Sequence, residues 1–283
     1  MTIFIPRLNV RTLLLFIVLL IPGPVFSQNQ KGMILSTKTN SGIGYVNVVI
    51  VGKNIGTVSD ETGKFTIALD NNYDNDSLRF SMIGYESKTL LIRQFKDDST
   101  KNVYLNPKLY NLLEVKVISR KASKPREIRV GTPVLSDELK SGFENNNLGS
   151  ELGIKVHVKE RVKLLNINLN VATCTFDSVT YRLNIYQLVN QTEYKNILNE
   201  PIYISFSKDK LGDVITYDLK KYSIVIDGDV LIALELYKDL GEGSLLFRTQ
   251  FFMGYTYHRK TIEGNWIAAP GEVGMYLQGQ LIK

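Results

Sequence analysis

Gly56-Thr57-Val58-Ser59-Asp60-Glu61-Thr62-Gly63-Lys64-Phe65, followed by Leu78-Arg79-Phe80-Ser81-Met82-Ile83-Gly84-Tyr85-Glu86, is the stretch that decides the fold of the first third of this chain. Asp60 and Gly63 occupy the first and fourth positions of a type I β-turn, where these residue types are preferred. Apolar residues then alternate with polar or small ones over 64–69 and again over 77–82, the period of a half-buried strand. Gly84 ends the second strand where a backbone kink is least costly.

These two motifs resemble those of the carboxypeptidase-like regulatory domain, a transthyretin-like β-sandwich of exported Gram-negative proteins. The family carries a GTVTDxxGxF hairpin and a later IGYE motif; both are present here, with Ser59 in place of the usual threonine. The resemblance covers about Lys31 to Ser119. In that family the domain often precedes the plug and barrel of TonB-dependent receptors, or accompanies a peptidase domain. The remaining chain is too short for a barrel of about 22 strands, so we expect the domain without plug, barrel or peptidase.

The first 27 residues have the pattern of a secretory signal peptide. Arg7 and Arg11 precede an apolar run over 13–21, and Val25-Phe26-Ser27 fits the peptidase site, which predicts cleavage between Ser27 and Gln28. The apolar run is about half the length needed to span a bilayer. We therefore expect an exported protein with no membrane span after cleavage, located in the periplasm or on the outer membrane or surface of a Gram-negative bacterium.

Alternating patterns separated by Gly, Asn and Asp predict an all-β protein of two β-sandwich domains, the first transthyretin-like and the second jelly-roll-like. We expect a first domain over 28–118, a basic linker over 119–130 and a C-terminal domain over 131–283. The first-domain strands are predicted at 31–36, 46–51, 56–59, 64–69, 77–82, 86–92, 102–105 and 113–118. The second-domain strands are predicted at 152–158, 162–171, 179–188, 214–219, 229–236, 245–253 and 273–281. A hairpin turn is expected at Asp227-Gly228-Asp229.

Charge and cysteine content limit the function classes. The segment 119–130 holds five basic residues against one acidic residue and has no strand or helix period, which favours a solvated linker over a nucleic-acid-binding face. A cationic strip facing an anionic lipid or glycan surface is the alternative. Cys174 is the only cysteine, so no intrachain disulfide can form, and its setting indicates a buried apolar role.

No metal or cofactor is predicted. The loop Asp70–Asp76 carries oxygen side chains at alternate positions, but it lacks the glycine and distal glutamate of an EF-hand loop, which favours a plain turn over a calcium site. His157 and Glu160 have H-x-x-E spacing and His258 lies far downstream, as in a zinc carboxypeptidase. On a strand, however, residues three apart point to opposite faces, and the strand pattern does not fit that enzyme.

Two further observations concern side chains of the second domain. Arg182 and Glu235 each lie mid-strand among apolar neighbours, so they either form a structural ion pair or point outward. Near the C-terminus, three aromatic residues lie next to polar residues in the sequence: Tyr255, Tyr257 and Trp266. They belong either to the core or to an exposed aromatic rim that stacks on sugar rings or on a partner's side chains.

The sequence lacks a nucleophile elbow, a phosphate loop and a convincing metal cluster. It therefore predicts a non-catalytic envelope protein that binds a protein or glycan partner and no nucleic acid, with Tyr255, Tyr257 and Trp266 as the binding residues and no catalytic residues. The alternative is a hydrolase with an unrecognised site in the C-terminal domain.

Overall fold

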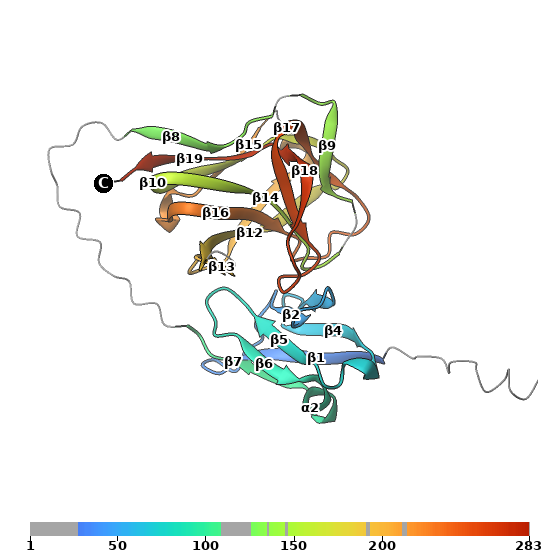
Figure 1. Ribbon diagram of the computed structural model, residues 1–283. Coiled ribbons are helices and arrows are strands. Elements are labelled where there is room, and N and C mark those ends of the chain that lie inside the picture. Colours follow the sequence, from blue (N-terminus) through green and yellow to red (C-terminus); the bar gives the residue numbers. More distant parts are fainter. Residues whose placement is uncertain are drawn as a thin grey trace, which may run out of the picture.

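The computed structural model of the 283-residue chain shows two β-rich units stacked on each other (Figure 1). It describes residues 28–108, 126–134, 136–144, 147–190, 193–210 and 214–282. The expected signal peptide, the expected strand at 113–118 and the first part of the expected linker therefore lie outside the described residues.

The first unit is a sandwich of two small sheets. The three-stranded sheet contains β4 (Lys64–Leu69), β1 (Gln28–Ser36) and β7 (Asn102–Leu105), in that order. The four-stranded sheet contains β3 (Gly56–Val58), β2 (Asn47–Ile50), β5 (Ser77–Ser81) and β6 (Lys88–Leu91). Apolar side chains from both sheets, among them Ile34, Val48 and Phe80, form one buried core. Strands β4 and β7 begin and end at the residues that the alternating pattern predicts.

The turn between β3 and β4 forms as the sequence predicts. The Gly63 amide donates to the Asp60 carbonyl, and Asp60 Oδ1 accepts from the amides of Thr62 and Lys64 and from the Thr62 hydroxyl. Gly63 has a φ of 87°, which a residue with a side chain adopts only under strain. These bonds hold the carboxylate charged and lower the pKa of Asp60, despite the opposing effect of burial.

A short helix, α2 (Ile92–Asp97), replaces the end of a predicted strand. The strand expected at 86–92 spans only Lys88–Leu91. The Ile92 amide donates a hydrogen bond to the Asp76 carbonyl, and the helix begins there. Phe95 then packs on Phe65 and Phe80 in the core. Beside it, the ammonium group of Lys96 donates to oxygens of Asp70, Asn71 and Asp74, so a lysine occupies the centre of the loop whose oxygen spacing suggested calcium.

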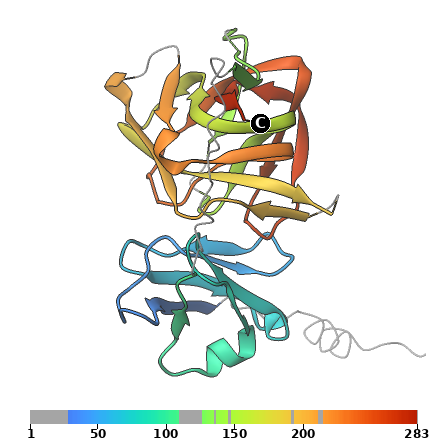
Figure 2. The ribbon, with the colours of Figure 1, turned by 90° about the vertical axis from the view of Figure 1, so that its left-hand side faces the viewer.

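The second unit is a single twelve-stranded sheet that folds over one core. Its strands are β8 (Glu127–Gly131), β9 (Leu139–Phe143), β10 (Glu151–Leu169), β11 (Val171–Cys174), β12 (Ser178–Val189), β13 (Glu193–Asn196), β14 (Ile202–Ser207), β15 (Ile215–Asp218), β16 (Val225–Glu235), β17 (Leu245–Arg259), β18 (Ile267–Val273) and β19 (Met275–Leu281). Strand β10 pairs with β16 and β17 through its first half and with β15 and β19 through its second half (Figures 1 and 2). It therefore connects the two parts of the folded sheet.

Three sequence predictions for this unit are wrong. The two strands expected at 152–158 and 162–171 are one strand, β10, with a bulge after Val158. The Asp227-Gly228-Asp229 segment is no hairpin turn: it continues β16, and Gly228, with a φ of 57°, lies opposite that bulge. Residues 127–130 of the expected linker, together with Gly131, form β8, which pairs with β19 and so extends the sheet.

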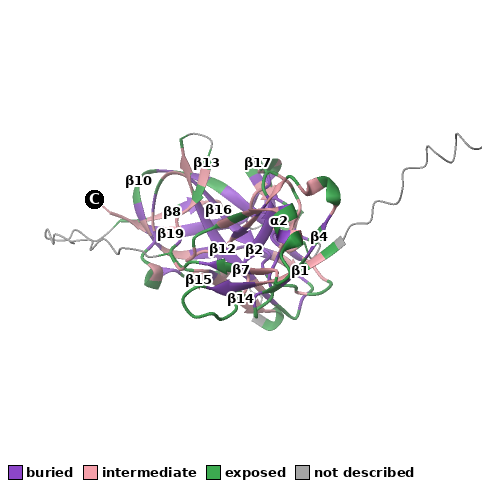
Figure 3. Cartoon of the chain, turned by 90° about the horizontal axis from the view of Figure 1, so that it is seen from below, coloured by how far each residue is buried: buried purple, intermediate pink, exposed green. Residues whose placement is uncertain are grey.

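The all-β class is confirmed, and many of the residues coloured as buried lie in the strands (Figure 3). Cys174 is buried at the end of β11, where its thiol donates to the Phe176 carbonyl and burial raises its pKa, as expected for an apolar role. None of the helices in the described part of the chain has the length and apolarity to cross a bilayer.

The two units meet sheet against sheet. The sheet that contains β2 and β5 lies next to the second unit (Figure 1). Asn47 of β2 bonds to Glu235 of β16, and Arg79 of β5 bonds to Glu263. In addition, Ile83 of the IGYE turn packs against the core of the second unit. The motif that identifies the first domain in the sequence therefore also docks it.

Candidate functional site

A row of four charged side chains lies at the contact between the units, and we call it the charge row. It consists of Arg259 on β17, Glu151 on β10, Glu235 on β16 and Arg182 on β12. Each member is directly opposite the next across neighbouring strands. All four are between 1% and 8% exposed. The alternation of side chains places them on the face opposite the main core, which takes Leu152, Leu183 and Leu234.

The charges in the row are paired. Arg182 binds Glu235 with two parallel hydrogen bonds from one edge of its guanidinium group, at 2.9 Å from Nε to Oε2 and 2.5 Å from Nη2 to Oε1. Arg259 donates from Nε to Glu151 Oε2. The structure therefore confirms the ion-pair alternative for Arg182 and Glu235, since two paired charges can be buried where one alone cannot.

Two neutral side chains join the pairs. Asn184 Nδ2 donates to Glu151 at 2.6 Å and to Glu235 at 2.7 Å. The Tyr186 hydroxyl donates to Glu151 at 2.7 Å and accepts from Arg259 at 2.8 Å. Burial, and then the Glu151 charge, raise the pKa of Tyr186, so its hydroxyl stays protonated as a donor.

The first unit completes the charge row. Asn47 Nδ2 donates to Glu235 at 2.9 Å. Arg182 Nη1 donates to the Tyr45 carbonyl at 2.7 Å and contacts Met82 Sδ at 3.1 Å. Tyr45 has a φ of 62°, an uncommon conformation for a residue with a side chain. A buried arginine thus holds a strained residue of the neighbouring unit, and such strain is typical of functional positions.

Two further polar interactions lie at the edge of the contact between the two units. Arg79 of β5 forms an ion pair with Glu263 at 2.8 Å, and the Thr261 hydroxyl donates to the Lys53 carbonyl at 3.2 Å. Glu263 and Thr261 belong to the loop between β17 and β18, which also carries Trp266. We call the whole contact, with the charge row at its centre, the domain joint.

The charge row contains the residue types of an acid–base site, but its carboxylate oxygens are not available to a substrate. Two carboxyl groups whose pKa values are pushed apart are a usual sign of general acid and base. Burial, and then the neighbouring Glu235 charge, raise the pKa of Glu151 against the effect of Arg259; Arg182 and its hydrogen bonds lower the pKa of Glu235 against burial. All four carboxylate oxygens, however, already accept hydrogen bonds within the protein. The geometry indicates a structural network.

The Glu235→Gln variant should show the pH dependence of this network. A lowered folded-state pKa stabilises the protein above the unfolded value of about 4.3 and loses that contribution as the pH falls through the folded value. The difference in unfolding free energy between wild type and Glu235→Gln should therefore be constant from pH 8 to 6 and shrink below pH 4.3. Urea unfolding at a series of pH values measures it. A difference that grows towards acid would show that Glu235 is not held as a charged group.

The three predicted binding residues do not form one exposed rim. Trp266 is half-buried, with its ring 4.3 Å from the Arg259 guanidinium and edge-on to Tyr186 at 6.0 Å. Tyr257 packs in the same small apolar cluster, beside Leu231 and Ala233. Tyr255 lies apart from that cluster and is 54% exposed. Trp266 thus covers the outer end of the charge row.

The strand β17 is irregular just before Tyr255. Its pairing with β18 skips from Gln250 to Tyr255, so four residues bulge out of the ladder. Phe252 has a φ of 69° and is 97% exposed, and Phe251 is exposed beside it.

The histidines lie too far apart for a shared metal. His258 is opposite Leu152 on β10, and His157 lies five residues further along that strand, or about 17 Å. His157 instead contacts Asp229 at 2.8 Å. Within the described residues, no three His, Cys, Asp or Glu side chains are grouped so that they could hold a metal ion.

Sequence reasoning missed Glu151, Arg259, Asn184, Tyr186 and Asn47. Arg182 and Glu235 were recognisable because apolar residues flank them on both sides. Glu151 and Arg259 lie at strand ends, where a charge is ordinarily solvated. Only the register of β10 between β16 and β17 places them beside the pair.

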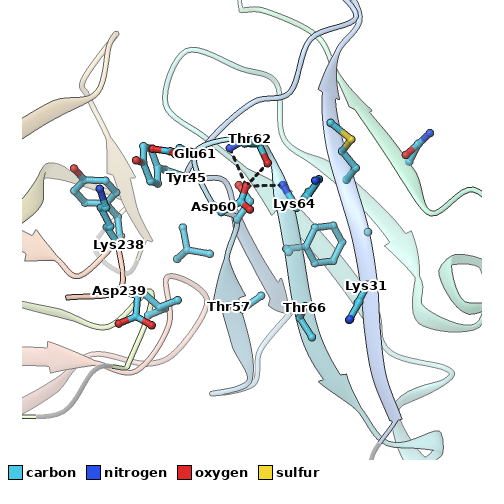
Figure 4. A pocket seen from close by; sticks show the side chains of 18 of the residues that line it. Lys31, Tyr45, Thr57, Asp60, Glu61, Thr62, Lys64, Thr66, Lys238 and Asp239 are labelled. Atoms are coloured by element: carbon cyan, nitrogen blue, oxygen red, sulfur yellow. Dashed lines mark hydrogen bonds between the residues drawn. The ribbon is translucent and has the colours of Figure 1, made fainter. Parts of the chain in front are cut away.

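Clefts open along the domain joint, and two of them bear on function. The smaller, of about 380 Å³, is lined by Asn184 and by three members of the charge row, Arg182, Glu235 and Arg259. The larger, of about 810 Å³, lies beside Tyr45 and is lined by both units. Figure 4 shows it between Lys31, Lys64 and Thr66 of the first unit and Lys238 and Asp239 of the second. We call the larger one the Tyr45 cleft.

Comparison with solved structures gives only weak similarity. A VP2 subviral particle of infectious bursal disease virus is 9% identical, covering 84% of this chain and 61% of the viral chain, with a TM-score of 0.15. A T=1 particle derived from the same virus is 10% identical, covering 86% and 61%, with a TM-score of 0.14. This chain thus spans about 61% of the viral chains, and scores this low do not indicate a shared fold. No curated protein matches the sequence.

The family comparison is informative for the first unit. Residues 30–117 match the CarboxypepD_reg-like domain, in agreement with the motifs at 56–65 and 78–86. The matched range includes every strand of the first sandwich except the first residues of β1. That family is a non-catalytic one. The first unit of this chain is therefore the part that is similar to the CarboxypepD_reg-like domain.

Proposed function

We propose that this protein is an exported, non-catalytic accessory protein of the Gram-negative cell envelope, located in the periplasm or at the outer membrane, and that it binds an envelope protein or glycan. Three observations support the proposal: the signal-peptide pattern over 1–27, the non-catalytic family of the first unit, and the paired state of the charge row.

The paired charge row is the observation that carries the proposal. A catalytic acid or base must reach the proton that it transfers. Glu151 and Glu235 face arginine, asparagine and tyrosine donors, and neither keeps a free oxygen for a substrate. The polar groups of the network instead fix the second unit to the first. A fixed pair of units with a cleft between them is suited to binding, because the protein loses little conformational freedom when a ligand enters.

A hydrolase remains the second candidate, and the same two glutamates are the groups that would favour it. Their pKa values are shifted in opposite directions, as in acid–base pairs. For this activity the charge row would have to open so that substrate replaces Asn184 or Tyr186 as a partner.

One experiment distinguishes the binding function from the hydrolase. The full chain is expressed with its own N-terminus in a Gram-negative host, and the intact mass of the envelope fraction is measured; we expect a chain that starts at Gln28. The purified protein is then incubated with isolated outer membranes and with peptidoglycan, followed by sedimentation and by chromatography of the supernatant. We expect co-sedimentation with one of these materials and no released product.

Product release would contradict the proposal if it is lost in Glu151→Gln while the melting temperature of that variant shows that it is folded. Retention of Met1 in a cytoplasmic protein would contradict the exported location. Asp218→Asn, a change at an exposed position remote from the joint, is the matched control for charge removal; it should sediment as wild type does.

A further inference from the structure

The Tyr45 cleft differs from the charge row in the state of its polar groups. It is lined by β1, β3 and β4 of the first unit and, across the joint, by 237–239 of the second. Its volume of about 810 Å³ is in the range of small-ligand sites. In Figure 4 the labelled side chains approach the opening from both units.

An aromatic wall stands at the joint side of this cleft. The ring of Tyr45 meets that of Tyr237 edge-to-face at 4.8 Å, and Tyr203 packs behind them at 4.6 Å from Tyr237. Tyr237 is fixed by a 2.8 Å hydrogen bond with Thr180. The Arg182 bond to the Tyr45 carbonyl holds the backbone of Tyr45. The wall is therefore supported by contacts that exist without a ligand.

Opposite this wall, polar side chains are unused. Within the described residues, the side chains of Lys31, Lys64, Lys238, Thr57 and Thr66 make no hydrogen bond or ion pair, and all five line the cleft. Lys31 and Thr66 are cross-strand neighbours on the outer face of the sheet. Ammonium and hydroxyl groups here can therefore donate to a ligand without breaking an existing bond.

The charges that line the cleft balance. Lys31, Lys64 and Lys238 are matched in number by Asp60, Glu61 and Asp239. A polyanion such as a nucleic acid or a uronic-acid polymer would meet three carboxylates, which favours a neutral ligand rich in hydroxyl groups.

We infer that the Tyr45 cleft binds a neutral oligosaccharide, with the Tyr45 ring against the apolar face of a sugar ring and with Thr66, Lys31 and Lys64 bonded to its hydroxyls. Tyr237, which is only 6% exposed, supports the Tyr45 ring from behind. This inference rests on the proposed binding function and names its ligand class and site. The charge row then also serves the cleft, because through Arg182 it holds the Tyr45 backbone in the conformation that builds the wall.

The test uses the full-length protein and isothermal titration with maltohexaose, cellohexaose and mannohexaose as neutral probes, with hexagalacturonate as the anionic probe. Thr66→Cys is labelled with a bulky maleimide; the native Cys174 is buried and should not react. The label enters the cleft from the side of the first unit, and no member of the charge row lines this cleft. Thr39→Cys, in an exposed turn that does not line the cleft, is labelled as the control.

We expect at least one neutral probe to bind, with at least tenfold weaker binding after labelling at position 66 and unchanged binding after labelling at position 39. Tyr45→Asn, which removes the ring and tolerates a positive φ, should weaken binding similarly while the protein, though less stable, remains folded at the temperature of the titration. If Tyr45→Asn fails to fold, the labelled variants decide alone.

Equal binding after labelling at position 66 would overturn the site. Failure of all neutral probes, or tighter binding of hexagalacturonate, would overturn the ligand class. Neither result touches the proposed function, because co-sedimentation with envelope material is measured separately.

Discussion

The Arg182→Met variant is expected to lose about 3–5 kcal/mol of unfolding free energy, the range for removing one partner of a buried ion pair. Methionine fills much of the space but leaves the Glu235 charge buried with only amide donors from Asn47 and Asn184. It also frees the Tyr45 carbonyl from its partner in the second unit. Urea denaturation at pH 7 measures the loss.

Two variants check that the cause is the unpaired charge. Arg79→Met breaks the ion pair at the rim of the joint, where the arginine is half exposed, and should change stability by no more than about 1 kcal/mol. Arg182→Met combined with Glu235→Leu removes both charges and should recover much of the loss. A double variant as unstable as the single one would contradict this explanation.

The Trp266→Ala variant should lose about 3 kcal/mol, at the lower end of the range for truncating a packed tryptophan because this ring is only half-buried. The ring covers Arg259 and packs on Tyr186, so its removal exposes the outer end of the charge row to water. Thermal and urea unfolding both report the change.

Trp266→Phe keeps an aromatic cover and removes an indole N–H that has no partner within the described residues. It should stay within about 1 kcal/mol of wild type, since an unpartnered buried donor contributes nothing favourable. Tyr255→Ala, at an exposed position on β17, is the matched control and should be nearly neutral. If Trp266→Ala matches Tyr255→Ala, the ring does not support the charge row.

Much of the first unit can be predicted from the sequence because its signals are local. The Asp60 turn, the alternation over 64–69 and the left-handed Gly84 depend on neighbouring residues, and each is present. The helix α2 is missed because its first amide bonds to Asp76, sixteen residues earlier in the sequence.

The second unit is less predictable because its strands are defined by distant pairings. Strand β18 contains Pro270 and Gly271, which weaken a strand signal, yet it pairs with β17 at the sheet edge. Strand β8 lies in a basic, Pro-containing segment and forms only because β19 offers it an edge.

The candidate site shows the same limit. The Arg182 and Glu235 pair was foreseeable, since a charge among apolar residues needs a partner. That Glu151 and Arg259 extend the pair into a row, and that Asn47 and Tyr45 close it from the other unit, depends on the register of four strands and on the docking of two sheets. Neither the register nor the docking can be recognised from a local sequence pattern.

The central claim is that the buried charge row joins the two units into one body. The most direct measurement inserts a specific protease site between Ser123 and Lys124 in the full-length chain, cuts it, and compares cut and uncut protein by size-exclusion chromatography at low micromolar concentration. The account predicts that both fragments elute together at the volume of the uncut protein, because Arg182, Glu235 and Asn47 still hold them. Separate elution of two folded fragments would contradict it.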